Sequence, residues 1–533
     1  MIDLLIIGSG GAGLCAALSG KENGCDVLVV SKTYPTHSQT VQAQGGINAV
    51  LYEEDDDSID LHIEDTYKAS CKLSNKDNIK TLCATAKESV LWLESIGVPF
   101  NKDENSKIKQ RKFGGTNKKR TCYSSDYTGL KIIHTLFDQS IKNKIAFKNE
   151  YFLLDLIVKN KRCYGAVFLD IKTGNIENIY SKSTILATGG YAGVYSNNST
   201  NSLSNCADGT AAALRAGVKL SNIEFVQFHP TALESSNILI SESARGEGAY
   251  LVDSKNKRFI DELKPRDEVT KAIYEKLVNK DKVYLDLRHL DESKINKLLP
   301  QEKRIALEYT NIDITKELLP INPAAHYSMG GIKTDKNFKT NIENLYACGE
   351  VAQSSIHGAN RLGGNSLIEI ITFGKKAGIS ASNNSKNIKD IKNIEYITSY
   401  KNKIENIYNL PNKINFYEKK DLLANELFEK VGIIKNENDL DDFINFIDNL
   451  NLQLPNMGIL DKSKIYNRNL VDFLEFLNQI EISKIIALCS KQRKESRGSH
   501  NRSEFKNISN EYEKYSYALI EDELLKIGFE EIS

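Results

Sequence analysis

The chain has no excess of charge of either sign and no long apolar run. Lys plus Arg and Asp plus Glu both number 70 in 533 residues, so the formal net charge at pH 7 is zero. This balance argues against a general nucleic-acid or membrane-surface binder. No apolar run reaches the ~20 residues of a membrane-spanning helix. The apolar strand at Ile2 has no basic segment before it, so we expect no signal peptide and a cytoplasmic protein.

The nine cysteines are scattered and form no C-x-x-C pair. Without paired thiols, the sequence offers no ligand framework for a zinc ion or an iron–sulfur cluster. We therefore expect reduced, mostly buried thiols and no metal site.

Hydrophobic patterning divides the chain into alternating strands and helices. Its length exceeds that of one ordinary domain, and two to four domains are expected. Residues 2–31 predict a strand, a glycine turn, a helix and a strand, and residues 147–190 are rich in strand patterns. Residues 222–325 alternate short strands with helices. Residues 343–380 return to a strand, a glycine-rich loop and a helix.

The C-terminal third is mainly helical in pattern. Residues 381–393 predict a polar linker, and residues 394–492 show apolar positions at three- and four-residue spacing. The last ~35 residues are charged, and we expect packing on the body to order them. RKESRGSH, which leads into them, is either a carboxylate-facing or interface element or a solvated run of charge.

A dinucleotide-binding motif lies between the first strand and the first helix. Gly8, Gly10 and Gly13 form G-x-G-x-x-G. The motif supplies a tight turn, close backbone approach to a pyrophosphate and a helix N-terminus for its phosphates. The second strand ends in Ser31-Lys32 rather than in the acid that usually binds the ribose. A hydroxyl can still make that hydrogen bond.

Two further glycine clusters fit a flavin dinucleotide. VQAQGGINAV contains Gln44, Gly45 and Gly46, and LATGGYAG follows a strand pattern at residues 186–193. Each cluster alone is more often a simple turn. The sequence lacks a second G-x-G-x-x-G after a strand, so we expect electrons to be exchanged with a partner other than a nicotinamide nucleotide.

Two glycine-containing segments each include a side chain that can be positively charged. PAAHYSMGGI contains His326, and HGANRLGGNSLIE contains Arg361. Arginine on such a turn can bind a carboxylate through two parallel hydrogen bonds. A flavin beside a cationic clamp predicts redox chemistry on a small dicarboxylate.

Long motifs of the chain resemble those of the succinate dehydrogenase/fumarate reductase flavoprotein family, to which L-aspartate oxidase is closely related. The resemblance covers residues 1–380 and resumes at RKESRGSHNR. The motifs are SKTYPTHSQTVQAQGG, QRKFGG, RTCY, DYTGLKIIHTL, EFVQFHPTAL, SESARGEG, KPRDEV, HYSMGGI and HGANRLGGNSL.

The resemblance implies an α/β fold in three parts. A Rossmann-like FAD-binding domain at residues 1–225 and 326–385 is interrupted by an α+β capping domain at residues 226–325. A helical domain at residues 394–492 and a C-terminal tail at residues 493–533 follow.

The resemblance also assigns roles to individual residues. Proton transfer falls on Arg266, with Glu242 and Arg245 as its relay. Substrate binding falls on His229, Ser241, His326, Arg361 and Phe113. FAD contacts fall on Gly8, Gly10, Gly11, Ala12, Gly13, Ser31, Lys32, Ser38, Gln39, Thr40, Gln44, Gly45, Gly46, Asp208, Glu350, Ser366 and Leu367.

Ordinary structural roles for the arginine and the two histidines are the alternatives, and the structure can test them. An arginine in this spacing is ordinarily a surface residue, paired here with Asp267 or Glu262. A buried histidine ordinarily has a structural role in a core. The motif resemblance favours functional roles for Arg266, His229 and His326.

One departure from the family concerns the flavin bond. The family usually has histidine in S-H-T, which links covalently to the flavin, and here the residues are Ser38-Gln39-Thr40. His37 lies two positions earlier and would share a face with Gln39 if the segment were extended. We expect non-covalent FAD, and therefore a lower flavin potential that favours fumarate reduction.

Three functions remain open from the sequence. The first is a catalytic flavoprotein subunit acting on fumarate and succinate, with an iron–sulfur subunit and a quinone-reactive membrane subunit that bring it indirectly to the inner face of the membrane. The second is L-aspartate oxidase. Phe113 stands where those oxidases have an acid, which opposes this reading. The third is a non-catalytic flavin-binding subunit.

Overall fold

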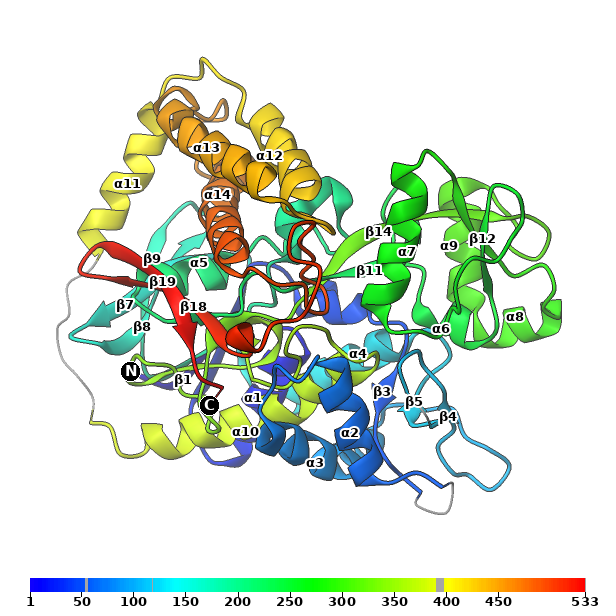
Figure 1. The fold of residues 1–533 in the computed structure, drawn as a ribbon. Coiled ribbons are helices and arrows are strands. Elements are labelled where there is room, and N and C mark those ends of the chain that lie inside the picture. The colour runs from blue at the N-terminus through cyan, green and yellow to red at the C-terminus, as the bar shows by residue number, and fades with distance from the viewer. Residues whose placement is uncertain (53–55, 117, 390–396, 533) are drawn as a thin grey trace.

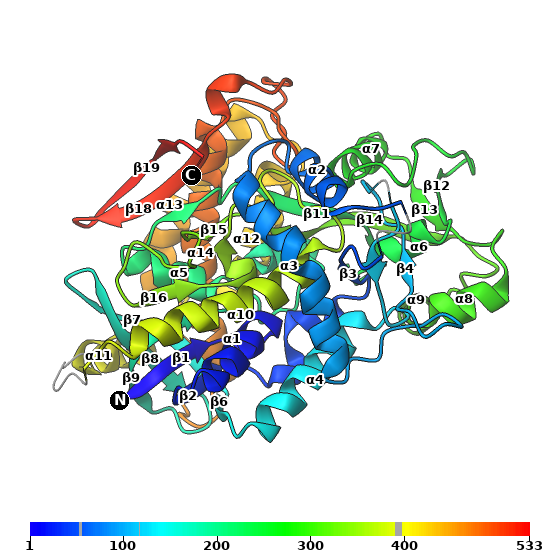
Figure 2. The ribbon, with the colours of Figure 1, turned by 90° about the horizontal axis from the view of Figure 1, so that it is seen from below.

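The computed structural model describes residues 1–52, 56–116, 118–389 and 397–532 (Figures 1 and 2). Among these residues, seven strands form one sheet in the order β6-β2-β1-β9-β8-β7, with β16 beside β9. The strands are β1 (Ile2–Ile7), β2 (Val27–Ser31), β6 (Ala146–Asn149), β7 (Tyr151–Lys159), β8 (Arg162–Asp170), β9 (Ile176–Leu186) and β16 (Leu345–Ala347). β7 and β8 pair antiparallel, and the strands around β1 are parallel. The strand–helix–strand prediction for residues 2–31 is confirmed.

Helices pack closely against this sheet. α1 (Gly11–Glu22) and α10 (Asn365–Ser385) contact each other, and α3 (Lys76–Ser95) lies beside α10 (Figure 2). Gly378 permits this contact, because a Cβ there would lie 2.4 Å from the carbonyl oxygen of Ala16. Gly13 is required for a similar reason, since its Cβ would lie 2.0 Å from the carbonyl oxygen of Gly8.

A second sheet projects from the body together with four helices (Figure 1). Its strands follow the antiparallel order β11-β14-β13-β12. These strands are β11 (Val226–Leu233), β12 (Tyr250–Asp253), β13 (Val283–Asp286) and β14 (Leu319–Ser328). The helices are α6 (Glu242–Gly246), α7 (Arg266–Val278), α8 (Glu292–Leu298) and α9 (Pro300–Thr310). Val269, Ile273 and Leu285 belong to an apolar cluster of its own.

A third, small sheet lies between these two parts of the chain. It pairs β3 (Ile47–Asn48), β5 (Thr121–Cys122) and β4 (Gln110–Arg111) antiparallel. α2 (Ile59–Ala69) and α4 (Thr128–Lys142) flank the same region of the sequence.

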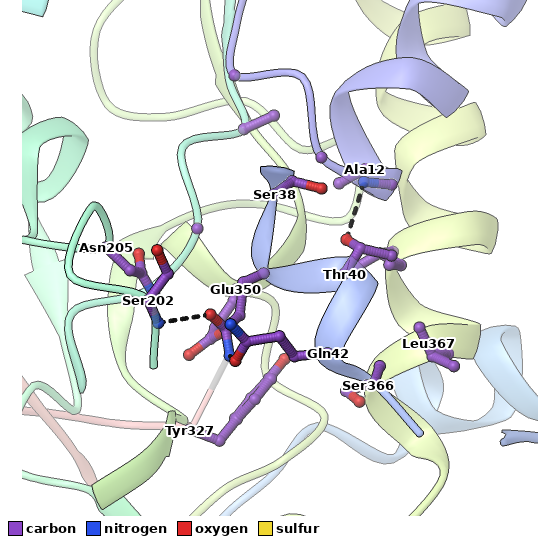
Figure 3. Close-up of a pocket in the computed structure, with 18 of the residues that line it drawn as sticks. Ala12, Ser38, Thr40, Gln42, Ser202, Asn205, Tyr327, Glu350, Ser366 and Leu367 are labelled. Carbon is purple, nitrogen blue, oxygen red and sulfur yellow. Dashed lines mark hydrogen bonds between the residues drawn. The ribbon is translucent and has the colours of Figure 1, made fainter. Parts of the chain in front are cut away.

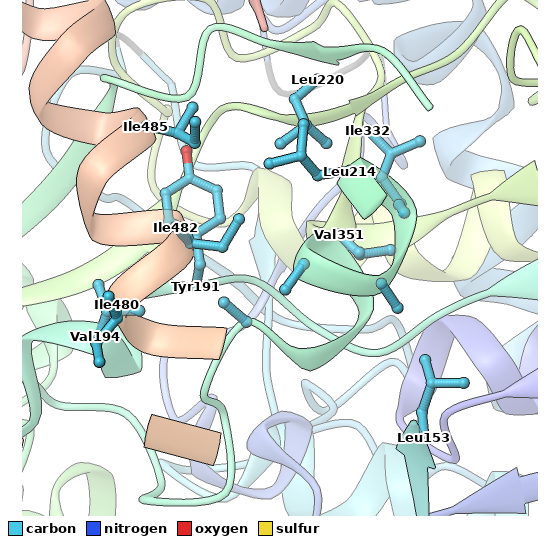
Figure 4. Close-up of a cluster of buried hydrophobic side chains, with 14 of the residues drawn as sticks. Leu153, Tyr191, Val194, Leu214, Leu220, Ile332, Val351, Ile480, Ile482 and Ile485 are labelled. Carbon is cyan, nitrogen blue, oxygen red and sulfur yellow. The ribbon is translucent and has the colours of Figure 1, made fainter. Parts of the chain in front are cut away.

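Four helices make up most of the C-terminal third. They are α11 (Ile397–Asn409), α12 (Phe416–Val431), α13 (Glu437–Gln453) and α14 (Arg468–Gln492). Figure 4 shows Ile482 and Ile485 of α14 in one buried cluster with Leu214 of α5 (Asp208–Arg215). This contact joins the helical part to the part that contains the seven-stranded sheet, and the four helices confirm the predicted helical pattern. None of the described helices combines the length and apolarity needed to cross a bilayer.

The predicted polar linker is partly wrong. Residues 381–385 belong to α10, where Ala381, Ser382 and Ser385 are buried and pack the end of that helix against the body. Residues 390–393 of the predicted linker, and residues 394–396 of the predicted helical region, lie outside the described residues.

The C-terminal residues pair with a strand from the middle of the chain. β18 (Tyr515–Glu521) pairs with β10 (Leu220–Ser221) and with β19 (Leu524–Glu530). These three strands continue a sheet of order β17-β15-β10-β18-β19, with β15 (Gly331–Lys333) and β17 (Ala352–Gln353). The C-terminal segment is therefore ordered by strand pairing as well as by the expected packing on the body.

The interpretation of RKESRGSH as a solvated charge run is wrong. Arg493 is fully buried and its guanidinium lies 2.6 Å from Glu224 and 3.0 Å from Glu495. Arg497 is also buried and pairs with Glu495 at 2.8 Å. The charges neutralise one another inside the fold, which a charge count along the sequence cannot distinguish from a solvated run.

Candidate active site

A deep pocket opens at the carboxyl end of β1 and reaches the base of the projecting sheet. Its lining contains the predicted substrate and relay residues Phe113, His229, Ser241, Glu242, Arg266, His326 and Arg361. It also contains the predicted FAD residues Gly8, Gly10, Gly11, Ala12, Ser31, Lys32, Ser38, Gln39, Thr40, Gln44, Gly45, Gly46, Asp208, Glu350, Ser366 and Leu367. Of the predicted residues, Gly13 and Arg245 do not line it. Gly13 lies against the carbonyl oxygen of Gly8 inside the turn, and Arg245 is buried next to the pocket residue Glu242 without lining the pocket.

The lining fits a bound dinucleotide. Gly10 caps α1 without a side-chain hydrogen bond, so the first N–H groups of the helix face the pocket. Thr40 Oγ accepts from the N–H of Gly11 at 3.1 Å (Figure 3). In the described part of the chain, the buried side-chain oxygens of Ser38, Gln44 and Thr188 lack a hydrogen-bond partner. Buried polar atoms without partners are costly, and a polar ligand would satisfy them.

Two acids from distant parts of the sequence lie beside the end of β2. Asp208, at the start of α5, lies 2.5 Å from the Lys32 ammonium, and Glu475 of α14 lies 2.8 Å from it. Burial opposes the charge of Lys32, but these two carboxylates outweigh it and raise its pKa. Ser31 Oγ accepts a hydrogen bond from Ser9 at 2.7 Å. Lys32 is therefore a neutralised structural cation that orients Asp208 at the pocket.

The segment around Gln39 is not extended. Residues Pro35–His37 (η1) and Gln39–Gln42 (η2) form two short 3₁₀ turns, so the expectation that His37 and Gln39 share the face of an extended segment is wrong. Gln39 Oε1 accepts from the N–H of Ser202 at 2.9 Å, and His37 is exposed at the pocket rim. The amide of Gln39 therefore joins two loops at the pocket.

Arg266 is buried and does not form the surface pair that its spacing suggests. Its Nε and Nη2 donate to Glu242 Oε2 at 2.8 and 2.5 Å, and its Nη1 donates to Gln227 Oε1 at 3.0 Å. Asp267 instead accepts from Asn360 at 2.9 Å. The surface-pair alternative is therefore wrong.

Glu242 is an ionised carboxylate between two arginines. Burial raises its pKa, but Arg266 and Arg245 outweigh burial and lower it. The N–H of Gly114 also donates to it at 2.8 Å. Arg245 donates to the carbonyl oxygen of Glu262 at 2.7 Å, and burial lowers its pKa. Arg266 contacts Glu242 directly, and Arg245 lies near enough to lower the pKa of Glu242, although its Nε and Nη2 have no hydrogen-bond partner among the described residues. These three side chains are called the Arg–Glu–Arg row below.

His229 and His326 face each other with ring centroids 4.9 Å apart. Burial and the nearby Arg266 hold both pKa values well below the usual range of histidine, so both rings are neutral at pH 7. His229 Nδ1 lies 3.1 Å from the carbonyl oxygen of Thr231 and 3.2 Å from the N–H of the same residue, so Thr231 fixes the orientation of the ring. Thr200 Oγ contacts His326 Nδ1 at 2.8 Å. The pair thus offers neutral imidazole rings rather than charges.

Arg361 is a buried cation that no described carboxylate pairs with. Its guanidinium stacks over the Tyr327 ring at 4.2 Å, and its Nε has no partner among the described residues. Burial, followed by repulsion from Arg266, lowers its pKa to about 10. Tyr327 is held from behind by Glu369, which accepts from its hydroxyl at 2.8 Å. An uncompensated buried cation of this kind is an anion site.

Gln227 connects the two arginines and was not predicted from the sequence. It accepts from Arg266, and its Nε2 donates to the carbonyl oxygen of Arg361 at 2.8 Å and to Asn360 at 2.8 Å. It is 1% exposed. The only sequence signal was its place in EFVQFHPTAL, next to the histidine of that motif.

Phe113 forms an apolar wall of the pocket. Its ring lies 2.7 Å from the position a Cβ would take on Gly45 and 3.2 Å from that on Gly363, so both glycines are needed for its placement. No charge is presented to the pocket at this position.

Comparison with known proteins identifies the family. Residues 3–367 match the model of the FAD binding domain, and residues 420–532 match that of the fumarate reductase flavoprotein C-terminal region. The chain belongs to the succinate dehydrogenase/fumarate reductase flavoprotein family. It is an FAD oxidoreductase with the α/β fold that its motifs predicted.

Relatives of this flavoprotein match along nearly its whole length. The succinate dehydrogenase flavoprotein subunit of Rickettsia bellii is 35% identical over 538 residues, covering 94% of this chain and 90% of the relative. The 8-methylmenaquinol:fumarate reductase flavoprotein subunit of Wolinella succinogenes is 36% identical over 525 residues, covering 94% and 86%. The FrdA chain of E. coli quinol fumarate reductase, solved as a point mutant, superposes with a TM-score of 0.95 at 31% identity, covering 100% of this chain and 96% of that one.

Proposed function

We propose that this flavoprotein interconverts fumarate and succinate as the catalytic subunit of a quinone-linked respiratory complex. The observation that carries the proposal is the Arg361 guanidinium, which pairs with no carboxylate of the described residues and is buried in the same pocket as the Arg266–Glu242 pair and the dinucleotide-binding turn. A small dianion and a flavin together use every one of these groups.

The binding step follows from the charges. Arg361 takes one carboxylate through parallel N–H donors and fixes its plane. His229, His326 and the hydroxyl of Ser241 donate to the other carboxylate. Because the histidines are neutral, they polarise that carboxylate without competing for its charge, and they help to turn it out of conjugation with the alkene.

The proton step uses the Arg–Glu–Arg row. An arginine is a weak acid, and it can act only where neighbouring cations and a dry site oppose its charge. In fumarate reduction Arg266 gives a proton to one alkene carbon and becomes neutral. Arg245 gives a proton to the Glu242 carboxylate, which passes it to Arg266 and is ionised again, and solvent restores the proton of Arg245. The 2.5 Å contact between Arg266 and Glu242 provides the path.

The FAD-binding roles of the lining residues rest on the fit of the pocket. The first turn of α1 and the loops around Gln39, Gly45 and Asp208 would hold FAD. When bound, FAD supplies or accepts the hydride at N5. The residues of this chain bind and orient the dicarboxylate, exclude water and move the proton.

We further propose that FAD is bound without a covalent link and that fumarate reduction is favoured. Glutamine cannot form the histidyl bond, and the side chain of Gln39 is already hydrogen-bonded to Ser202. Acid precipitation of the holoenzyme should release all of its flavin into the supernatant, and the variant His37→Ala should behave identically. Flavin that stays on the wild-type pellet but leaves that of His37→Ala would show that His37 forms the link.

The names of the relatives support a proposal on the partners and the position in the cell. The Rickettsia bellii and Wolinella succinogenes relatives are named as flavoprotein subunits, the latter of an 8-methylmenaquinol:fumarate reductase. We propose an iron–sulfur subunit as the electron partner and a quinone-reactive membrane subunit behind it, which would hold this subunit at the inner face of the membrane. We keep the division into an FAD domain (1–225 and 326–385), a cap (226–325), a helical domain (394–492) and a C-terminal segment (493–533).

L-aspartate oxidase is the second candidate, because both substrates are small dicarboxylates. The apolar wall at Phe113 favours a substrate without an ammonium group. Anaerobic addition of succinate is expected to bleach the flavin absorbance, whereas L-aspartate should leave it unchanged. Bleaching by L-aspartate would replace the proposed function with the oxidase.

A further inference from the structure

A buried acid that the sequence did not single out holds the backbone at the substrate site. Glu302 lies in the first turn of α9 and is 1% exposed. Its Oε1 accepts a hydrogen bond from the backbone N–H of Ser241 at 3.0 Å. Ser241 lines the pocket and begins α6, the short helix that carries Glu242 and Arg245.

The helix that carries Glu302 is anchored from the flavin side of the pocket. Asp126, just before α4, accepts from the N–H groups of Gln301 and Glu302 at 2.7 and 3.1 Å. These bonds cap the N-terminus of α9, whose own cap residue makes none. Asp126, the start of α9, Glu302 and Ser241 thus form one chain of contacts between the two parts of the fold.

The buried charges around Glu302 do not balance if every acid is ionised. Arg111 is the nearby buried cation, and it donates to the carbonyl oxygens of Gly45 and Ser125 rather than to an acid. Two carboxyl groups, Asp126 and Glu302, lie close enough to Arg111 to interact electrostatically with its positive charge. Within the described residues, Asp126 Oδ1, Glu302 Oε2 and Arg111 Nη1 are buried without a hydrogen-bond partner.

Burial raises the pKa of both carboxyl groups, but Asp126 accepts from two backbone N–H groups and Glu302 from only one, which places the shared proton on Glu302. Burial and the adjacent Asp126 raise the pKa of Glu302 well above its usual range, and Arg111 only partly opposes them. The other titratable groups facing this cluster are Tyr123 and Glu247 beside Arg111, and Tyr127 beside Asp126. Among these, Glu247 would also disfavour a second negative charge, whereas burial raises the pKa of Tyr123 and of Tyr127 and keeps both neutral.

A neutral acid suits this place. An ionised carboxylate behind Ser241 would repel a dicarboxylate substrate, whereas a protonated one accepts from the Ser241 N–H without that cost. The Ser241 hydroxyl already accepts from the N–H of Ser243 at 3.2 Å, so its direction depends on where the backbone is held.

We propose that Glu302 is a positioning residue of the active site, a protonated acid that fixes the backbone of Ser241 and so directs its hydroxyl at the substrate carboxylate. The inference rests on the proposed function, because it takes Ser241 as a substrate contact. It adds a residue, a protonation state and a connection to Asp126 that the proposed function does not require.

The test compares two substitutions with the reconstituted FAD enzyme and malonate, a dicarboxylate that cannot be dehydrogenated. Glu302→Gln keeps a carbonyl oxygen for the Ser241 N–H and should keep the Kd for malonate within about threefold. Glu302→Leu removes that acceptor and should raise the Kd by about 10- to 100-fold, the size expected when a contact group is displaced by a fraction of an ångström to 1 Å. Glu308→Leu, at an exposed position of the same helix, is the matched control and should change nothing.

Flavin content and thermal midpoint separate positioning from folding. The proposal requires Glu302→Leu to lose malonate affinity while it retains bound FAD. Should that variant not fold, infrared spectroscopy of the wild type and Glu302→Gln decides, because the wild type should show a protonated-carboxyl band that Glu302→Gln lacks.

Three results would overturn the inference. They are equal loss of affinity in Glu302→Gln and Glu302→Leu, unchanged affinity in Glu302→Leu, and identical carboxyl bands in wild type and Glu302→Gln. Failure of the wild type itself to bind malonate would instead count against the proposed function, and the infrared comparison would still report on Glu302.

Discussion

Replacing Arg266 by glutamine is expected to lower kcat for fumarate reduction by about 10²- to 10⁴-fold, the usual contribution of a positioned proton donor. Glutamine preserves much of the length and polarity of the side chain but has no acidic proton to give. Arg266 makes no bond to the predicted FAD residues, so flavin content should be unchanged. Steady-state turnover with a reduced viologen dye as electron donor measures the loss.

A second variant separates the loss of the proton donor from a loss of stability. Removal of Arg266 leaves Glu242 without its 2.5 Å partner, and breaking a buried pair typically costs about 3–5 kcal/mol of stability. The double variant Arg266→Gln with Glu242→Gln removes both charges and should recover much of that stability without recovering turnover. Recovery of turnover along with stability would mean that Arg266 is structural.

Replacing Arg361 by alanine is expected to weaken dicarboxylate binding more than any other single substitution. Loss of one partner from a buried, hydrogen-bonded charge pair costs about 2–5 kcal/mol, or about 30- to 4,000-fold in Kd. The Kd for malonate, read from the flavin spectrum, measures the effect. Arg258→Ala, an exposed arginine of the projecting part, is the control and should bind normally.

The same residue predicts a pH dependence. The pKa of Arg361 lies at about 10 in the ligand-free protein, because burial and Arg266 oppose its charge. The charged form binds the dianion, so affinity should be constant from pH 7 to 9 and should fall as the pH rises through about 10. A flat profile up to pH 11 would contradict an Arg361 anion site with this pKa.

Much of the architecture around the flavin was predictable, because the glycines act locally. Gly8 adopts a φ of 112°, and Gly13 must lack a Cβ where the helix crosses the strand end. Such requirements leave a readable pattern over six residues. The motifs that carry His326 and Arg361 are similarly short, and both side chains do line the pocket that the first motif begins.

The residues that support the site from behind could not be predicted, because their contacts are distant in the sequence rather than local. Gln227, Arg111 and Glu302 each act through contacts with residues more than ten positions away in the sequence, and no periodicity or spacing marks them. The buried Arg493 shows the same limit, because its partner Glu224 lies 269 residues earlier. Polar residues of this kind are identified only when the fold brings their partners together.

The pairing of Leu220 with Ala518 sets an order of events during synthesis. Almost three hundred residues separate the two strands, so a ribosome adding about 5–20 residues per second leaves β10 without this neighbour for about 15–60 s. During that interval β10 presents an open edge beside β15, the strand that follows the His326 motif. Tight flavin loading should therefore be post-translational, and chains stalled before residue 515 should be poor at retaining FAD and prone to aggregation.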